Sequence, residues 1–304
     1  MTRLLEGKVA LITGGGRGVG RGIALAMAEA GARVVVNDIG ATLDGRAGDE
    51  QPAHEVVALI EKMGGKAIVD GGSVADWGAA HKMVEAAVNA FGRIDIVVNN
   101  AGILRDAMFH RMSEPEFDAV IAVHLKGSFN VSRAAAPHFK AQGSGCYVHM
   151  TSTSGLIGNF GQANYSAAKL GIVGLSKSIA LDMQRFGVRS NAVAPFAWTR
   201  MIDSIPSETE EQKKRVEGLK KLVPERVAPF VVGLCADAAS DVSGQIFGVR
   251  NNEIFLFSQP RPIRSAHCGD GWTAQGVLDT ALPMLRAGFF GLERSGDVFT
   301  WDPV

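Results

Sequence analysis

Short apolar runs recur along the first two thirds of the chain, separated by segments in which apolar residues return every three or four positions. The runs lie at residues 8–13, 33–37, 66–69, 94–98, 146–150 and 188–193. Because these runs are apolar throughout rather than alternating, they are typical of strands covered on both faces of a parallel sheet. The intervening segments, at residues 18–30, 55–63, 77–91, 114–141 and 163–186, predict helices, the fourth broken once and bent near Pro137.

This alternation predicts an α/β protein with a doubly wound parallel sheet, the Rossmann fold. This alternation of strands and helices ends after Pro195. We expect a charged stretch at residues 204–222 and an amphipathic helix at residues 224–236. Two short strands at residues 245–249 and 253–257 and a last helix at residues 273–287 should follow. We expect a single domain over residues 1–304, of which residues 250–304 form a C-terminal extension.

Composition narrows the function classes. The chain has 304 residues, and 31 basic side chains balance 31 acidic ones. This neutral balance argues against a nucleic-acid partner. No apolar run is long enough to span a membrane and no signal peptide is evident, so we expect a cytoplasmic protein. Three scattered cysteines indicate neither a disulfide framework nor a metal site.

A glycine-rich turn follows the first predicted strand, with the sequence Thr-Gly-Gly-Gly-Arg-Gly-Val-Gly at residues 13–20. Such a turn lets backbone N–H groups approach a pyrophosphate at a helix N-terminus. Asp38 ends the second strand, where a carboxylate accepts hydrogen bonds from ribose hydroxyls and repels a 2′-phosphate. This pattern predicts NAD as the cofactor, with contacts from Gly14, Arg17, Gly18, Val19, Gly20 and Asp38. The alternative is an ordinary tight turn followed by a surface aspartate.

Further segments in order resemble the short-chain dehydrogenase/reductase family. They are Asn99-Asn-Ala-Gly102 after the fourth strand, Ser152 after the fifth, Tyr165-Ser-Ala-Ala-Lys169, and Pro195 after the sixth with Thr199 nearby. The resemblance covers roughly residues 6–202. It implies further cofactor contacts from Ser73, Val74, Asn100, Ala101, Gly102, Tyr165, Lys169, Pro195 and Thr199.

The resemblance also implies catalytic roles for Ser152, Tyr165 and Lys169. Tyr165 and Lys169 lie one helical turn apart, so the ammonium should favour the phenolate and lower the pKa of Tyr165. Tyr165 would act as general base, and Ser152 would orient the substrate oxygen. The alternative is a buried tyrosine beside a structural lysine. The only other tyrosine, Tyr147, has no lysine four residues on.

The chain departs from the family pattern at several positions. His124 stands where many members have an asparagine that completes a proton relay, and it is either a relay residue or a structural histidine. Ser73 replaces a common aspartate beside the adenine. Phe196 replaces the glycine that usually follows Pro195, which puts the shape of that loop in question.

Longer strings, such as Gly158-Asn-Phe-Gly-Gln-Ala-Asn-Tyr165, resemble the dehydrogenase domain of peroxisomal multifunctional enzymes. That resemblance implies oxidation of a 3-hydroxyacyl-CoA with NAD. Alternatives are a hydroxysteroid dehydrogenase, an NADPH-linked 3-oxoacyl carrier-protein reductase, and a non-catalytic dinucleotide-binding protein. We expect a homodimer, with a tetramer as the alternative, formed through the helices at residues 116–141 and 163–186.

Two groups of side chains on the expected substrate side can each be interpreted in two ways. Basic residues in the charged stretch either meet CoA phosphates or form a solvated helix face; they are Lys213, Lys214, Arg215, Lys220 and Lys221. Aromatic and apolar residues near the site either line an acyl or sterol slot or simply pack; they are Phe160, Phe196, Trp198 and Met201.

Overall fold

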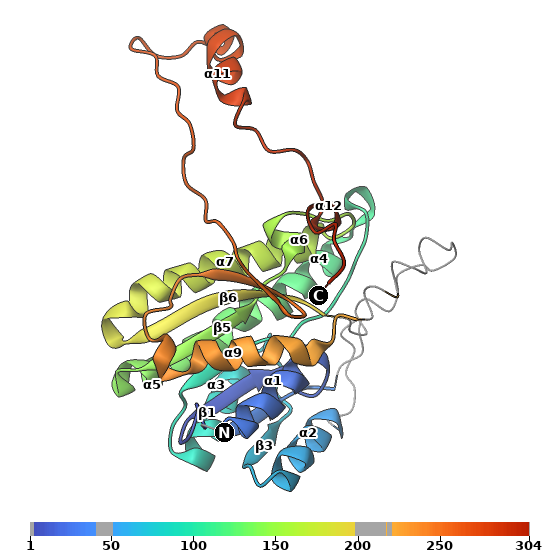
Figure 1. Cartoon of the computed structure of the whole chain (residues 1–304), viewed down its shortest axis with the longest axis vertical. Helices are drawn as coiled ribbons and strands as arrows, with labels where there is room; N and C mark the ends of the chain where they lie inside the picture. The colour runs from blue at the N-terminus through green and yellow to red at the C-terminus, as the bar shows by residue number, and fades with distance from the viewer. Residues whose placement is uncertain (1–2, 41–50, 198–216, 218–220, 304) are drawn as a thin grey trace.

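A computed structural model describes residues 3–40, 51–197, 217 and 221–303, and its centre is one eight-stranded sheet (Figure 1). The strand order is β3-β2-β1-β4-β5-β6-β7-β8, and every pair is parallel except β7 with β8. The strands are β1 (Val9–Thr13), β2 (Arg33–Asn37), β3 (Ala67–Asp70), β4 (Ile96–Asn99), β5 (Gly145–Met150), β6 (Val188–Phe196), β7 (Ile246–Arg250) and β8 (Glu253–Leu256). All eight predicted strands and the doubly wound class are confirmed.

Helices cover both faces of the sheet. On one face lie α1 (Gly18–Glu29), α2 (Gln51–Lys62) and α9 (Ala228–Cys235); on the other lie α3 (Trp77–Phe91), α5 (Gly127–Gln142) and α7 (Ala163–Met183). Alternate residues of β1 supply the two cores, since Ala10 and Ile12 join the first and Val9 and Leu11 the second. This two-sided burial is why the strands read as continuous apolar runs.

The long helical segment expected at residues 114–141 is interrupted once, as predicted, but the interruption is a π-helical turn and does not lie at Pro137. The α4 helix (Glu114–Ile121) begins with a capping box between Ser113 and Glu116 and runs into a π-helical turn, Ala122–Lys126, before α5. The α5 helix itself continues through Pro137. The break therefore lies around His124, and π-turns of this kind frequently occur at functional sites.

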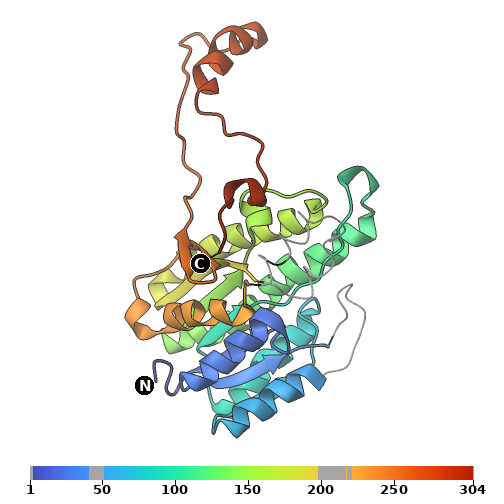
Figure 2. The ribbon, with the colours of Figure 1, turned by 45° about the vertical axis from the view of Figure 1, so that its right-hand side comes forward.

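The two short strands expected at residues 245–249 and 253–257 form an antiparallel hairpin, β7 with β8, and Asn251 in its turn lies in the left-handed region at φ 55°. After β8 the chain leaves the body as a long arm that carries α10 (Ala274–Gly276), a π-turn (Val277–Ala281) and α11 (Leu282–Arg286) (Figures 1 and 2). It then returns to the body as α12 (Ser295–Val298). The arm is part of the expected C-terminal extension.

The described part of the chain holds no helix long and apolar enough to cross a membrane. Within those same residues, no group of three or more potential ligands is arranged to hold a metal ion.

Candidate active site

The carboxyl ends of β1, β4, β5 and β6 meet at one edge of the sheet, and the candidate residues gather there. The loop between β1 and α1 and the start of α1 can pass close to β4 because Gly14 and Gly20 lack side chains. A Cβ on Gly20 would lie 2.1 Å from the Gly14 carbonyl oxygen, and a Cβ on Gly14 would lie 2.9 Å from the Cα of Ala101. Gly14 and Gly18 also take positive φ angles of 62° and 50°. The predicted glycine cradle is therefore present, with the N-terminus of α1 facing it.

Thr13 and Asn100 fix this cradle to the neighbouring strand. The Asn100 amide donates to the carbonyl oxygens of Thr13 and Gly14, each at 3.0 Å. The Thr13 hydroxyl oxygen accepts hydrogen bonds from the backbone N–H groups of Asn100 and Ala101. The Asn-Asn-Ala-Gly segment thus holds the shape of the glycine loop, a role that sequence reasoning did not give it.

Asp38 lies at the rim of the cradle, as the sequence predicts. One carboxylate oxygen accepts the backbone N–H of Gly16 at 2.9 Å, and the other accepts that of Gly40 at 2.8 Å. The residue is partly exposed. Because each oxygen has a second lone pair, the carboxylate keeps capacity to accept hydroxyl hydrogen bonds.

The turn after β3 closes the adenine side of the expected site. The Asn37 amide donates to the Asp70 side chain and to the Gly72 carbonyl oxygen, each at 2.8 Å. Val74 is buried, and its carbonyl oxygen accepts the Asn130 amide. Ser73 is partly exposed beside it. These bonds fix the turn that carries Ser73 and Val74, and their contact with a cofactor stays a prediction.

Ser152, Tyr165 and Lys169 come together at the end of β5. Ser152 follows the strand and begins a short helix, α6 (Thr153–Leu156), by accepting the backbone N–H of Ser154. Ser152 lies close enough to Tyr165 to influence the pKa of its hydroxyl. One helical turn along α7, the Lys169 ammonium donates to the Met150 carbonyl oxygen at 2.6 Å and lies 5.5 Å from the centre of the Tyr165 ring.

Burial dominates the acid–base properties of this group. It raises the pKa of Tyr165 to about 12; Ser152 opposes the rise and the Asp106 carboxylate adds to it. Burial also lowers the pKa of Lys169 to about 7. The expectation that Lys169 lowers the pKa of Tyr165 is therefore wrong in direction for this structure, because loss of hydration outweighs attraction to an ammonium that points at Met150.

His124 lies on the π-turn, and its ring meets the Tyr165 ring edge-on with centroids 5.2 Å apart. Its Nε2 is 2.8 Å from the carbonyl oxygen of Ile103, while its buried Nδ1 has no hydrogen-bond partner in the structure. Burial, aided by the charge of Lys169, lowers its pKa to about 3, so the ring is neutral. Gly102 makes room for it, because a Cβ there would lie 2.3 Å from the imidazole Cε1.

Asn164 is a positioning residue that sequence reasoning missed. Its amide donates to the carbonyl oxygens of Arg105 and Glu116, and its side-chain oxygen accepts the backbone N–H of Tyr165 at 2.7 Å. It ties the start of α7 to the loop after β4 and to α4. An asparagine just inside the start of the helix was the available signal, since asparagine side chains bond to the backbone there.

The far wall of the site contains the C-terminal segment of the chain. Phe299 packs edge-on against Phe196 with centroids 4.7 Å apart, and Ser295 donates its backbone N–H to the Gly158 carbonyl oxygen at 3.0 Å. Pro195 and Phe196 end β6. The predicted contact Thr199 and the residues Trp198 and Met201 lie outside the described residues, as do Lys213, Lys214, Arg215 and Lys220.

Comparisons with known proteins agree with this geometry. Residues 8–209 match the model of the short chain dehydrogenase family. The chain is 46% identical to the peroxisomal multifunctional enzyme type 2 of Mus musculus over 79% of its own length and 31% of that enzyme's. It is 39% identical to the hydroxyacyl-CoA dehydrogenase ChsB1 of Mycobacterium tuberculosis, over 84% of this chain and 81% of that one.

Among solved structures, a short chain dehydrogenase from Mycobacterium avium is 40% identical and superposes with a TM-score of 0.81. The superposition covers 93% of this chain and 96% of that one, so it includes most of the C-terminal extension. With a family match over more than half of its length, the chain belongs to the short-chain dehydrogenase/reductase family of oxidoreductases.

Proposed function

We propose that the chain is an NAD-dependent dehydrogenase that interconverts a 3-hydroxyacyl-CoA and the corresponding 3-oxoacyl-CoA. The observation that carries the proposal is the meeting of Ser152, Tyr165 and Lys169 at the strand end beside the glycine cradle. Two relatives, a peroxisomal multifunctional enzyme and a hydroxyacyl-CoA dehydrogenase, support the substrate class.

Ser152, Tyr165 and Lys169 have separate roles at the reacting carbon. NAD, when bound, supplies the acceptor for the hydride. The Ser152 hydroxyl donates a hydrogen bond to the substrate oxygen, and the Tyr165 phenolate oxygen accepts the alcohol proton. Lys169, held by the Met150 carbonyl oxygen one helical turn along α7, places its amino group beside the Tyr165 ring.

Asp38 supports NAD rather than NADP. Its carboxylate is fixed at the cradle rim by the N–H groups of Gly16 and Gly40. A 2′-phosphate at this rim would meet a like charge that cannot turn away without losing two hydrogen bonds. The same feature disfavours the NADPH-linked carrier-protein reductase.

Phe160 and Phe196 support an apolar acyl chain on the substrate side. Phe160 is 70% exposed on the loop before Tyr165, and Phe196 is partly exposed at the end of β6. Apolar side chains beside a few convergent polar groups are typical of small-molecule sites. A sterol ring would use the same surface, so the hydroxysteroid dehydrogenase remains the second candidate.

We also propose that the chain forms a homodimer through α4, α5 and α7. Large apolar side chains are exposed on these helices, namely Phe117, Phe129, Leu170 and Leu181. Sedimentation equilibrium would test this, and a monomer at micromolar concentration would contradict it.

The experiment that tests the function is a side-by-side assay of NAD and NADP with (3R)-hydroxyacyl-CoA thioesters, hydroxysteroids and a 3-oxoacyl carrier protein. We expect kcat/KM to be highest for a hydroxyacyl-CoA with NAD. Faster turnover of a hydroxysteroid would favour the second candidate, and a preference for NADPH and carrier protein would overturn the proposal. Absence of turnover with every substrate would leave a dinucleotide-binding protein without catalysis.

A further inference from the structure

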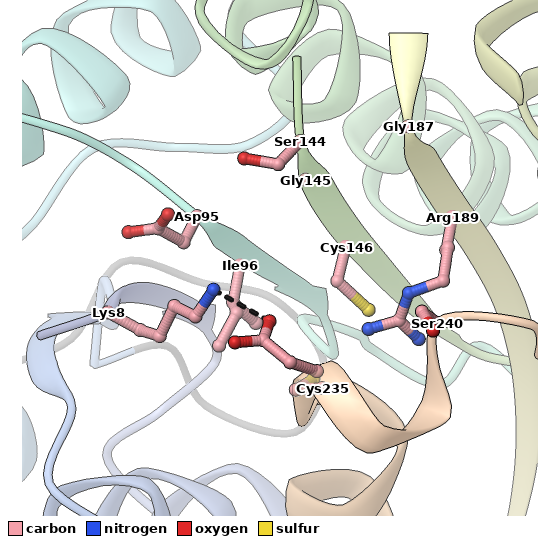
Figure 3. A pocket seen from close by; sticks show the side chains of 11 residues that line it. Lys8, Asp95, Ile96, Ser144, Gly145, Cys146, Gly187, Arg189, Cys235 and Ser240 are labelled. Carbon is pink, nitrogen blue, oxygen red and sulfur yellow. Dashed lines mark hydrogen bonds and ion pairs between the residues drawn. The ribbon is translucent and has the colours of Figure 1, made fainter. Parts of the chain in front are cut away.

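A second pocket opens at the edge of the sheet opposite the candidate active site. It has a volume of about 250 Å³ and lies where β4, β5 and β6 begin and where α9 ends (Figure 3). Cys146 is near the start of β5, whereas Ser152 follows the end of that strand, about 20 Å away at the rise of an extended chain. The pocket is therefore separate from the dinucleotide edge.

Two of the three cysteines of the chain line this pocket together. Cys146 comes from β5 and Cys235 is the last residue of α9. The Cys146 sulfur lies 3.7 Å from the carbonyl oxygen of Leu234, the residue before Cys235, so the two cysteines are neighbours in the lining of the pocket. Each residue is only 3% exposed, so the pocket is their route to small solutes.

Two cations, Arg189 and Lys8, act on the Cys146 thiol, and the carboxylates of Asp95 and Asp237 also line the pocket. Arg189 pairs with Cys146 across β5 and β6, and its guanidinium donates to the carbonyl oxygens of Leu234 and Ala236 at the end of α9. Lys8 also lines the pocket, in an ion pair with Asp237 at 2.8 Å. Interaction with the Cys235 side chain lowers the pKa of Cys146, helped by Arg189 and Lys8 and opposed by burial, while the Cys146 side chain and burial raise the pKa of Cys235. The pair thus has the unequal thiols of a reactive dithiol.

We propose that Cys146 and Cys235 form a reversible disulfide when a peroxide enters this pocket. The Cys146 thiolate attacks one peroxide oxygen, the O–O bond breaks, and a sulfenic acid and water result. The Cys235 thiol then attacks the sulfenic sulfur, the S–S bond forms and a second water leaves. Two thiols lose two electrons and two protons to hydrogen peroxide, and an external dithiol reverses the reaction by exchange.

The bond would join the sheet to the end of α9 by a covalent link. The link would add a covalent bond to the side-chain packing and the hydrogen bonds from Cys146 and Arg189 that now hold the end of α9 to the sheet. The α9 helix packs in the same core as α1, the helix behind the glycine cradle. Nothing in this step uses Tyr165 or the cradle, so it stands independently of the proposed catalytic function.

The test is oxidation of the full-length chain carrying Cys268→Ser, which removes the remaining thiol. One equivalent of hydrogen peroxide should lower its mass by about 2 Da, the two hydrogens lost in a disulfide. It should also yield a peptide pair linked through Cys146 and Cys235. Dithiothreitol should restore both thiols to alkylation. Two freely alkylated thiols after oxidation, or stable sulfinic acid without a linked peptide, would overturn the proposal.

Matched variants separate the roles of the two thiols. In Cys235→Ala the reaction should stop at a sulfenic acid on Cys146 that a dimedone probe traps. Arg189→Gln should slow cross-linking several-fold, and Arg189→Lys should restore most of the rate. An unchanged rate in Arg189→Gln would contradict activation of Cys146 by its cation. If a pocket variant fails to fold, the presence or absence of the linked peptide in the Cys268→Ser chain still decides whether Cys146 and Cys235 form a disulfide.

Discussion

The Lys169 ammonium nitrogen lies 5.5 Å from the centre of the Tyr165 ring, one turn along the same helix. It is turned toward the end of β5, where the Met150 carbonyl oxygen accepts its hydrogen bond. Burial places the pKa of Lys169 near 7 and that of Tyr165 near 12, so both groups are far from their values in water. Perturbed pairs of this kind cluster at functional sites.

Tyr165→Phe should therefore lose about 10²- to 10⁴-fold in kcat, the range of a single general base, while NAD binding is retained. Initial rates of NADH formation and a direct NAD titration measure the two effects. The matched control is Tyr147→Phe, which removes the other tyrosine hydroxyl, buried and bonded to the Ser132 carbonyl oxygen. That variant should lose stability and keep its turnover. Substantial activity in Tyr165→Phe would remove the tyrosine from its assigned role.

Asp38→Asn should weaken the preference for NAD over NADP by about tenfold or more, because one unit of charge beside the 2′ position is worth roughly 1–2 kcal/mol at a partly exposed site. The amide oxygen can still accept one of the two N–H groups, that of Gly16 or that of Gly40, while the amide NH2 faces the other. The ratio of kcat/KM for the two dinucleotides measures the effect. An unchanged ratio would show that the carboxylate does not select the cofactor.

Gly20→Ala should abolish dinucleotide binding, since the added methyl would lie 2.1 Å from the Gly14 carbonyl oxygen and 2.5 Å from the Asn100 amide nitrogen. Gly174→Ala on α7 is the control, because its methyl meets nothing within 4 Å. It should be neutral or raise the free energy of unfolding by up to about 1 kcal/mol. Equal NAD affinity in the two variants would contradict the close approach seen at the cradle.

The sequence predicts most of this fold because each strand is apolar on both faces and each intervening helix has the α-helical period. The positions of Ser152, Tyr165 and Lys169 also follow from spacing, since strand ends and helical turns are local features. Two things could not be read from the chain. The raised pKa of Tyr165 depends on burial by segments distant in sequence, and the return of Phe299 to Phe196 depends on the path of the whole arm.

The buried histidines predict a loss of stability in mild acid. Burial lowers the pKa of His149 to about 3 in the folded chain, against 6.5 in its ordinary state. Between these values the unfolded chain binds a proton that the folded chain does not, so the free energy of unfolding falls as the pH drops below 6.5. By pH 5 the loss is about 2 kcal/mol for this histidine. His124 should behave alike.

Urea unfolding at pH 7 and pH 5 measures this effect. His149→Gln retains an oxygen that can accept the Asn99 amide, and it should show a smaller loss between the two pH values. His267→Gln, at an exposed position, should follow the parent chain. A pH dependence that is identical in all three chains would show that His149 does not titrate as its burial requires.

Phe299→Ala tests whether the C-terminal segment shapes the substrate side of the site. The ring packs on Phe196 at 4.7 Å and on Phe255 at 5.3 Å between centroids, so it holds the residue after Pro195 against the β7–β8 hairpin. Its loss frees Phe196 to move, and small misplacements of a binding wall reduce kcat/KM strongly. We expect kcat/KM for a hydroxyacyl-CoA to fall about tenfold, mainly through KM, with NAD affinity unchanged because the cradle lies on β1 and β4. Phe289→Ala, 60% exposed on the arm, is the control and should change neither constant. If both variants lose activity equally, the whole arm, and not Phe299 in particular, supports the substrate side of the site. If neither variant loses activity, Phe196 keeps its position without Phe299, and the β7–β8 hairpin alone shapes that wall.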